Sequence, residues 1–141
     1  MDSIDELLTN AQTIAVVGLS DDPARPSHGV AAYLRDAGYH VIPVNPNIAE
    51  WEGVPSVAAL DDIEEPVDVV NIFRRPEHVP ELVDAAIRIG ATAVWMQLGI
   101  KHPEAARKAE DAELVVVQDK CIAVEHKNRL EAHRVSEEGA W

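Results

Sequence analysis

The chain of 141 residues contains one cysteine, four lysines and no apolar run long enough to span a membrane. Cys121 has no second thiol with which to form an intramolecular disulfide, and the cysteine and six histidines show neither CxxC nor HxxxH spacing. The sequence does not open with a basic amphipathic leader. We therefore expect a cytoplasmic protein with no signal peptide, membrane span or metal site.

Positive charge is also scarce, because 12 lysines and arginines are set against 25 aspartates and glutamates, giving a net charge of −13 at pH 7. Nucleic-acid binding needs a basic surface, so this composition argues against a nucleic-acid partner. The acidic residues are spread over predicted helix faces and turns, which is typical of a solvated acidic surface. An anionic ligand would have to be held by nearby arginines and backbone amides against this field.

Length and composition together predict one domain. Hydrophobic residues make up 47% of the sequence, which is enough for a chain of this size to bury a two-sided core without disulfides. We expect the domain to span residues 1–141, with an N-terminal helix within residues 1–12 and a flexible tail over residues 131–141.

A strand, a polar loop and a helix are predicted at the start of this domain. Five strand-compatible residues from Thr13 to Val17 end at Gly18, and a helical pattern begins at Ser27. Unpaired amides and the helix dipole favour an anion at a helix N-terminus, and a glycine in the turn lets phosphates approach the backbone. The segment therefore predicts the opening of a nucleotide-binding βαβ unit.

Strand and helix patterns alternate along the rest of the chain. Strands are predicted at 39–44, 67–73, 93–97 and 114–117, and helices at 77–89, from 103 for about ten residues, and from 119 or 120 to about 130. Residues 48–54 are expected to form a loop, and residues 56–60 a helical turn capped by Ser56. Five strands that alternate with helices predict an α/β fold with a doubly wound, mostly parallel five-stranded sheet.

A ligand crevice is predicted at the edge of the sheet where the strands end. Four segments should meet there: residues 18–29, 44–47, 73–76 and 96–100. The signal for NAD is weak, because G-x-G-x-x-G is missing and Asn45 occupies the position where a dinucleotide-binding protein usually has an acidic residue. The P-loop motif G-x-x-x-x-G-K-[ST] is missing as well.

Five motifs follow one another in an informative order: Val16-Val17-Gly18-Leu19-Ser20, Arg25-Pro26-Ser27-His28-Gly29-Val30, Pro43-Val44-Asn45-Pro46, Phe73-Arg74-Arg75-Pro76-Glu77 and Trp95-Met96-Gln97-Leu98-Gly99-Ile100. Over roughly residues 11–130 the chain resembles the small stand-alone CoA-binding proteins. That family is related to the CoA-binding domain of the succinyl-CoA synthetase alpha subunit. The resemblance implies a single Rossmann-like domain that binds CoA or an acyl-CoA, often with no assigned catalytic activity.

The same resemblance implies a set of site residues. The CoA diphosphate would meet Gly18, Leu19 and Ser20, with Arg25, Ser27 and His28 nearby. Val44, Asn45 and Pro46 would flank the adenosine, Phe73 and Arg74 would line the adenine and pantetheine side, and Met96, Gln97 and Gly99 would contact the pantetheine arm. Such proteins commonly have a lysine, suited to the 3′-phosphate, where this chain has Asn47, so that phosphate is either weakly recognised or held by another base.

The functional interpretation that we favour is a non-catalytic carrier, sensor or regulatory module, because no Ser-His-Asp, Cys-His or paired-carboxylate arrangement occurs at an interpretable position. Ligase activity would need partner chains, and the protein could form a homodimer or bind a partner enzyme. A different interpretation is a small NAD(P)-binding oxidoreductase in which the Asn45 amide binds ribose. Cys121, next to Lys120 and before the last predicted helix, suits either a mixed disulfide with CoA or a small buried core residue.

Overall fold

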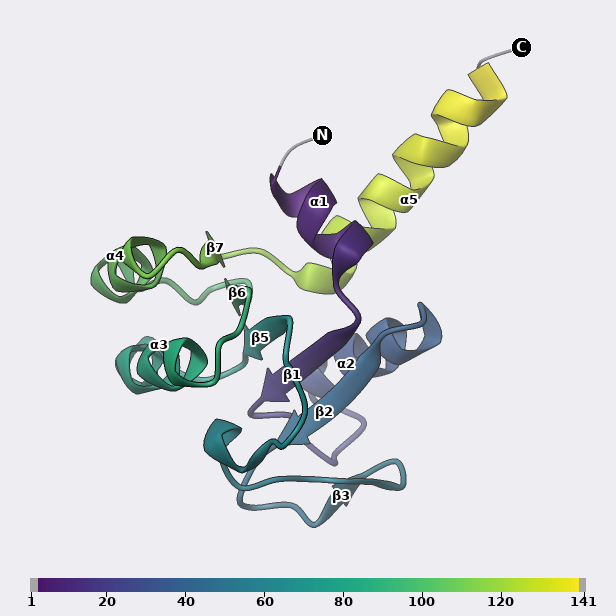
Figure 1. Ribbon diagram of the computed structural model, residues 1–141. Coiled ribbons are helices and arrows are strands. Elements are labelled where there is room, and N and C mark those ends of the chain that lie inside the picture. The colour runs from purple at the N-terminus through teal and green to yellow at the C-terminus, as the bar shows by residue number, and fades with distance from the viewer. Residues whose placement is uncertain (1–2, 140–141) are drawn as a thin grey trace.

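The computed structural model describes the backbone of residues 3–139 and the side chains of residues 3–132 (Figure 1). In chain order the elements are α1 (Ser3–Asn10), β1 (Thr13–Val17), α2 (Pro26–Asp36), β2 (His40–Val44), β3 (Glu50–Trp51), β4 (Val54–Pro55), the 3₁₀ turn η1 (Leu60–Asp62), β5 (Val69–Ile72), the 3₁₀ turn η2 (Pro76–His78), α3 (Val79–Arg88), β6 (Ala93–Met96), α4 (Pro103–Asp111), β7 (Val115–Val117) and α5 (Ile122–Gly139). The five predicted sheet strands are all present, with ends that differ by no more than a few residues.

These five strands form one parallel sheet in the order β2-β1-β5-β6-β7. The prediction of an α/β fold with a doubly wound parallel sheet is therefore confirmed. The chain builds outward from β1 in both directions, with β2 on one side of it and β5 on the other. In such sheets the point where the strand order reverses opens a crevice at the carboxyl ends, which here means the ends of β1, β2 and β5.

Alternate residues of each strand separate two hydrophobic layers. In β1, Ala15 and Val17 pack in the layer of α3 and α4, whereas Ile14 and Val16 pack in the layer of α1, α2 and the start of α5. Figure 1 shows α3 and α4 side by side on one side of the sheet. Both faces of the sheet are thus covered, which explains why its strands are continuous apolar runs rather than alternating ones.

The segment 48–54 forms a small antiparallel hairpin, so the prediction of a plain loop was wrong. β3 and β4 pair through Trp51 and Val54, and Gly53 at φ +81° supplies the turn between them. Trp51 is only 1% exposed and packs in the layer of α2. Burial of this large aromatic side chain fixes the hairpin against the domain, and such a tertiary contact leaves no periodic signal in the sequence.

The helical turn predicted at residues 56–60 was also misplaced, because the 3₁₀ turn η1 begins at Leu60. Ser56 caps no helix. Its hydroxyl donates to the carbonyl oxygen of Asn45 (3.0 Å) and accepts a hydrogen bond from the Asn45 N–H (3.2 Å). Ser56 therefore fastens the chain that follows the hairpin to the end of β2.

The last helix, α5, begins at Ile122 and continues to Gly139, well past the predicted end near residue 130. Its sequence contains good helix formers and no glycine or proline before Gly139, so nothing local ends it earlier. In Figure 1 its second half projects from the domain. A flexible tail over residues 131–141 stays a prediction, and residues 140–141 lie outside the described residues. Within residues 3–139, no helix has the length and apolar character needed to cross a bilayer.

Candidate functional site

A cavity of about 540 Å³ opens where β1, β2 and β5 end. Its walls come from three sources: the residues at these strand ends, the segment 58–61, and one face of α3. The strand ends contribute the backbone of Gly18, the loop 44–47 after β2, and the side chains of Phe73 and Arg74 after β5. The cavity therefore lies where a doubly wound sheet holds its ligand.

Gly18 allows the three strand ends to meet at this cavity. Its N–H donates to the carbonyl oxygen of Val44 (2.9 Å), and the N–H of Phe73 donates to the carbonyl oxygen of Val17 (2.9 Å). Gly18 has φ +85°, and a Cβ at this position would lie only 2.4 Å from the carbonyl oxygen of Phe73. Both the backbone conformation and the close approach of β5 therefore require glycine.

Asn45 holds the loops after β1 and β2 together. Its Nδ2 donates to the carbonyl oxygen of Leu19 (3.0 Å), and its Oδ1 accepts a hydrogen bond from the N–H of Asn47 (2.9 Å). Both ends of the side-chain amide are thus engaged within the protein. The side chain fixes the shape of the cavity wall.

The loop between β1 and α2 is held by its own serine and aspartate side chains. Ser27 Oγ accepts a hydrogen bond from the Ser20 N–H (3.0 Å), and Ser20 Oγ accepts one from the Asp22 N–H (3.0 Å). The N-cap residue of α2, Arg25, makes no side-chain cap, and Pro26 follows it as the first helical residue. The first turn of α2 is thus without a side-chain cap, so an anion placed there would gain from its amides and from the helix dipole.

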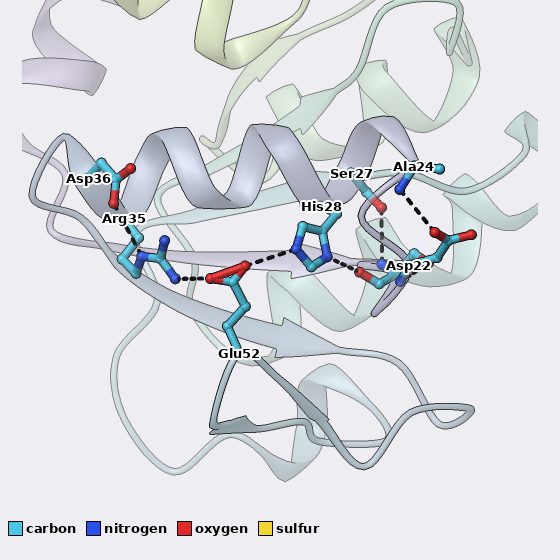
Figure 2. Close-up of polar contacts among 8 residues, drawn as sticks. Asp22, Ala24, Ser27, His28, Arg35, Asp36 and Glu52 are labelled. Atoms are coloured by element: carbon cyan, nitrogen blue, oxygen red, sulfur yellow. Dashed lines mark hydrogen bonds and ion pairs between the residues drawn. The ribbon is translucent and has the colours of Figure 1, made fainter.

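His28 connects this loop to the β3–β4 hairpin, as Figure 2 shows. Its Nδ1 lies 3.0 Å from the carbonyl oxygen of Ser20, and its Nε2 lies 2.9 Å from Glu52 Oε2. The other oxygen of Glu52 accepts a hydrogen bond from Arg35 (2.6 Å), whose guanidinium lies 5.1 Å from the centroid of the Trp51 ring. A carbonyl and a carboxylate both accept, so the two contacts of His28 are satisfied together when its imidazole is protonated. His28 braces the loop from outside the cavity.

The contacts of Glu52 with His28 and Arg35 stabilise the fold to an extent that depends on pH. Hydrogen bonds from Arg35 and then from His28 lower the pKa of the Glu52 carboxyl below its ordinary value of 4.5. A carboxyl with a lower pKa in the folded state stabilises the fold above the unfolded pKa, and this contribution is lost as the pH falls through the folded pKa. We expect Glu52→Gln to lower the Tm at neutral pH, and the difference from wild type to shrink at about pH 3.

Thermal melts of the two proteins at neutral and acidic pH test this expectation. Glu50→Gln is the matched control, because Glu50 is an exposed glutamate of the same hairpin, and it should change the Tm little at either pH. A Glu52→Gln difference that is as large at about pH 3 as at neutral pH would contradict the role assigned to the carboxylate.

Two arginines line the cavity, and they differ in their surroundings. Arg74 is half-buried, and its Cδ lies 3.1 Å from the point where a Gly18 Cβ would be; no carboxylate among the described side chains pairs with it. Arg88 forms a bidentate ion pair with Asp61, with Nε–Oδ1 at 3.0 Å and Nη2–Oδ2 at 2.7 Å. These hydrogen bonds lower the pKa of Asp61 and raise the pKa of Arg88. The cavity thus has one unpaired and one paired guanidinium.

The sequence matches the family described as CoA binding domain over residues 12–127. The chain belongs to this family. It is 43% identical over 123 residues to the uncharacterized protein YneT of Bacillus subtilis (strain 168), a match that covers 87% of this chain and 91% of that protein. A hypothetical protein from Pyrococcus horikoshii OT3 is 38% identical, with a TM-score of 0.87 over 90% of this chain and 89% of that chain.

A domain of this family's fold also occurs inside a larger protein. The apo form of the dinucleotide-forming acetyl-coenzyme A synthetase 1 of Ca. Korarchaeum cryptofilum is 25% identical, with a TM-score of 0.70. The match covers 79% of this chain but only 26% of that chain. The resemblance to CoA-binding proteins that five sequence motifs predicted is therefore confirmed by the family match.

The predicted site residues of this CoA-binding domain fall into three groups in the structure. The cavity brings together Gly18, Val44, Asn45, Pro46, Phe73 and Arg74. The loop after Gly18 and the start of α2 hold Ser20, Arg25, Ser27 and His28, none of which lines the cavity. The third group also lies outside the cavity lining and comprises Leu19, Met96, Gln97 and Gly99.

For this third group, contact with a ligand stays a prediction. Leu19 and Met96 are fully buried and expose no side-chain surface to a ligand. Gln97 is 4% exposed, and its side-chain oxygen already accepts two hydrogen bonds from within the core.

The sequence analysis missed the wall formed by residues 58–61 and α3. Leu82, Ala85 and Arg88 recur every three residues along α3 and border the cavity, next to the buried face that contains Val83. Helical periodicity predicted the helix at 77–89 but did not indicate that one of its faces borders the crevice. Topology could have found this wall, because α3 is the first α-helix after β5 and one of its faces must border the crevice at the end of β5.

Proposed function

We propose that the protein binds CoA or an acyl-CoA in the cavity at the ends of β1, β2 and β5. The observation that carries the proposal is a cavity of about 540 Å³ lined by the close backbone at Gly18 and by Arg74, which pairs with no described carboxylate. The loop that begins at Gly18 leads to the start of α2, which has no side-chain cap. Amides at a helix start and a guanidinium are the groups that hold a diphosphate in proteins. These groups attract the phosphates locally, although the net charge of −13 on the whole chain repels them.

In this proposal the diphosphate lies between the Gly18 loop and Arg74, with the exposed Arg25 at the start of α2 as a further cation. The adenosine lies between the loop 44–47 and the face of α3 that presents Leu82 and Ala85. The pantetheine arm leaves along the loop 96–100 at the end of β6. His28 acts through the loop that it braces.

We propose that this module is a carrier, sensor or regulatory partner of another protein. In support of binding without nucleophilic catalysis, the described residues that line the cavity include no serine, cysteine, histidine or lysine. Of the two carboxylates there, that of Asp61 is held by Arg88, and Glu81 lies exposed on α3. A homodimer or a partner enzyme fits the exposed Val124 and Leu130 on α5, which a second chain could cover.

The NAD(P) interpretation assigned ribose binding to the amide of Asn45. That amide is engaged by the carbonyl oxygen of Leu19 and by the N–H of Asn47. We therefore do not propose an oxidoreductase. Cys121 is half-buried and directly precedes α5, and its reaction with CoA disulfide stays a prediction.

Calorimetric titration of wild type, Arg74→Ala and Arg75→Ala with CoA tests the proposed function. We expect Arg74→Ala to weaken CoA binding by about 10- to 100-fold, because a guanidinium contact to a phosphate contributes about 1.5–3 kcal/mol. Arg75→Ala is the matched control, since Arg75 is the next residue, 85% exposed, and lies 3.9 Å from Glu77. It should bind CoA nearly as wild type does.

Three outcomes would contradict the proposal. Wild type that binds no CoA excludes it, and wild type that prefers NAD to CoA restores the oxidoreductase. Equal losses in Arg74→Ala and Arg75→Ala would indicate a general charge effect and would remove Arg74 from the site.

A further inference from the structure

A second cation, Arg88, lines the cavity from a different element, the end of α3. CoA carries two separate anionic groups, the diphosphate and the 3′-phosphate on its ribose. Arg74 follows β5 and packs against Gly18, whereas Arg88 is the last residue of α3 and pairs with Asp61 in η1. Among the described residues that line the cavity, these two arginines are the cations and Asp61 and Glu81 the anions.

The ion pair with Asp61 leaves donors of Arg88 unused. The two hydrogen bonds join Nε to Oδ1 and Nη2 to Oδ2, so they take two of the five guanidinium N–H groups and leave three. The Arg88 side chain is 58% exposed, which keeps the remaining donors accessible. A planar guanidinium with free N–H groups on one edge suits the oxygens of a phosphate.

The position of Arg88 fits the adenosine end of the ligand. Arg88, Ala85 and Leu82 border the cavity from α3, and the loop that contains Asn45 and Asn47 borders the same cavity. Asn47 offers a neutral amide and no positive charge. Resting on the proposed function, we propose that Arg88 binds the 3′-phosphate of CoA and makes the cavity prefer CoA to dephospho-CoA.

Asp61 limits the size of this preference. The hydrogen bonds from Arg88 keep the pKa of Asp61 below its ordinary value, so the carboxylate is ionised at neutral pH and the pair has no net charge. The phosphate gains hydrogen bonds from Arg88 while it is repelled by Asp61. Removal of the carboxylate alone should therefore retain or increase the preference for CoA, whereas removal of Arg88 should abolish it.

Calorimetry with CoA and dephospho-CoA on wild type, Arg88→Ala, Asp61→Asn and Arg107→Ala tests this. We expect wild type to prefer CoA by about tenfold, and Arg88→Ala to bind CoA no more tightly than dephospho-CoA, because the Asp61 carboxylate is then left without its cation. Asp61→Asn breaks the same ion pair but keeps the cation, and should retain the preference. Arg107→Ala changes the net charge equally at an exposed position of α4 outside the cavity, and should behave as wild type.

Different failures have different meanings. Wild type that binds neither ligand overturns the proposed function and this inference with it. Wild type that binds both ligands equally, or Arg88→Ala that keeps the preference for CoA, overturns only the role of Arg88. If Asp61→Asn loses the preference as fully as Arg88→Ala does, the ion pair shapes the wall of the cavity and Arg88 does not bind the 3′-phosphate.

Discussion

Replacement of Gly18 by alanine should cause one of the largest losses of stability of any single substitution at the site. The residue has φ +85°, where an L side chain is strained, and its Cβ would lie 2.4 Å from a backbone oxygen of Phe73. Because that neighbour is backbone, β1 and β5 would have to move apart where both border the cavity. We expect a loss of about 3 kcal/mol in the free energy of unfolding and a Tm lower by about 6–12 °C.

Gly29→Ala provides the matched control, because it makes the same chemical change 11 residues later in the helix α2. A Cβ at Gly29 would meet nothing within 4 Å, and alanine favours a helix over glycine by about 0.5–1 kcal/mol. Gly29→Ala should therefore raise the Tm slightly. Thermal melts of both variants and of wild type test this prediction. A Gly18→Ala protein that melts within about 2 °C of wild type would show that the strand ends tolerate a side chain there.

The sequence predicted the sheet well because the burial of each strand is visible in the strand's own run of apolar residues. β1 has the predicted bounds Thr13–Val17, since a strand buried on both faces must be apolar at consecutive positions. The β3–β4 hairpin could not be predicted in this way. Its strands have two residues each, and its position follows from burial of Trp51 against the layer of α2.

The same difference separates the site residues that the sequence predicted from those that it did not predict. Gly18, Asn45 and Arg74 lie at strand ends, where topology and motif together predict a ligand crevice, and they do line the cavity. The cavity wall formed by residues 58–61 and α3, and the contact that holds the loop after β1, both depend on residue pairs far apart in the chain. His28 meets Glu52 across 24 residues, and Arg88 meets Asp61 across 27 residues. No local pattern indicates such pairs, so the sequence predicted neither the contact of His28 with Glu52 nor a role for Arg88.

Replacement of Gln97 by leucine should also be costly, for a reason inside the core. Gln97 is 4% exposed, and its Oε1 accepts hydrogen bonds from Asn71 Nδ2 (3.1 Å) and from the N–H of Ile122 at the start of α5 (2.9 Å). Asn71 is fully buried and its Oδ1 has no partner among the described residues. Leucine would leave the Ile122 N–H unpaired and would leave Asn71 Nδ2 with only its long hydrogen bond to the carbonyl oxygen of Trp95 (3.5 Å). Each lost hydrogen bond costs about 1–3 kcal/mol. We expect a loss of about 2–5 kcal/mol in the free energy of unfolding.

Denaturant unfolding of Gln97→Leu and Gln118→Leu tests whether Gln97 stabilises the core or contacts the ligand. Gln118 is the matched control because its Oε1 also accepts a backbone hydrogen bond, from the His102 N–H (2.9 Å), but it is only half-buried. Water can replace that bond, so Gln118→Leu should cost no more than about 1 kcal/mol. CoA titration of the folded fraction completes the test. If Gln97→Leu is far less stable than Gln118→Leu and its affinity for CoA is nearly unchanged, the side-chain oxygen of Gln97 anchors α5 to the sheet. If Gln97→Leu is instead as stable as Gln118→Leu but binds CoA about tenfold more weakly, Gln97 contacts the pantetheine arm.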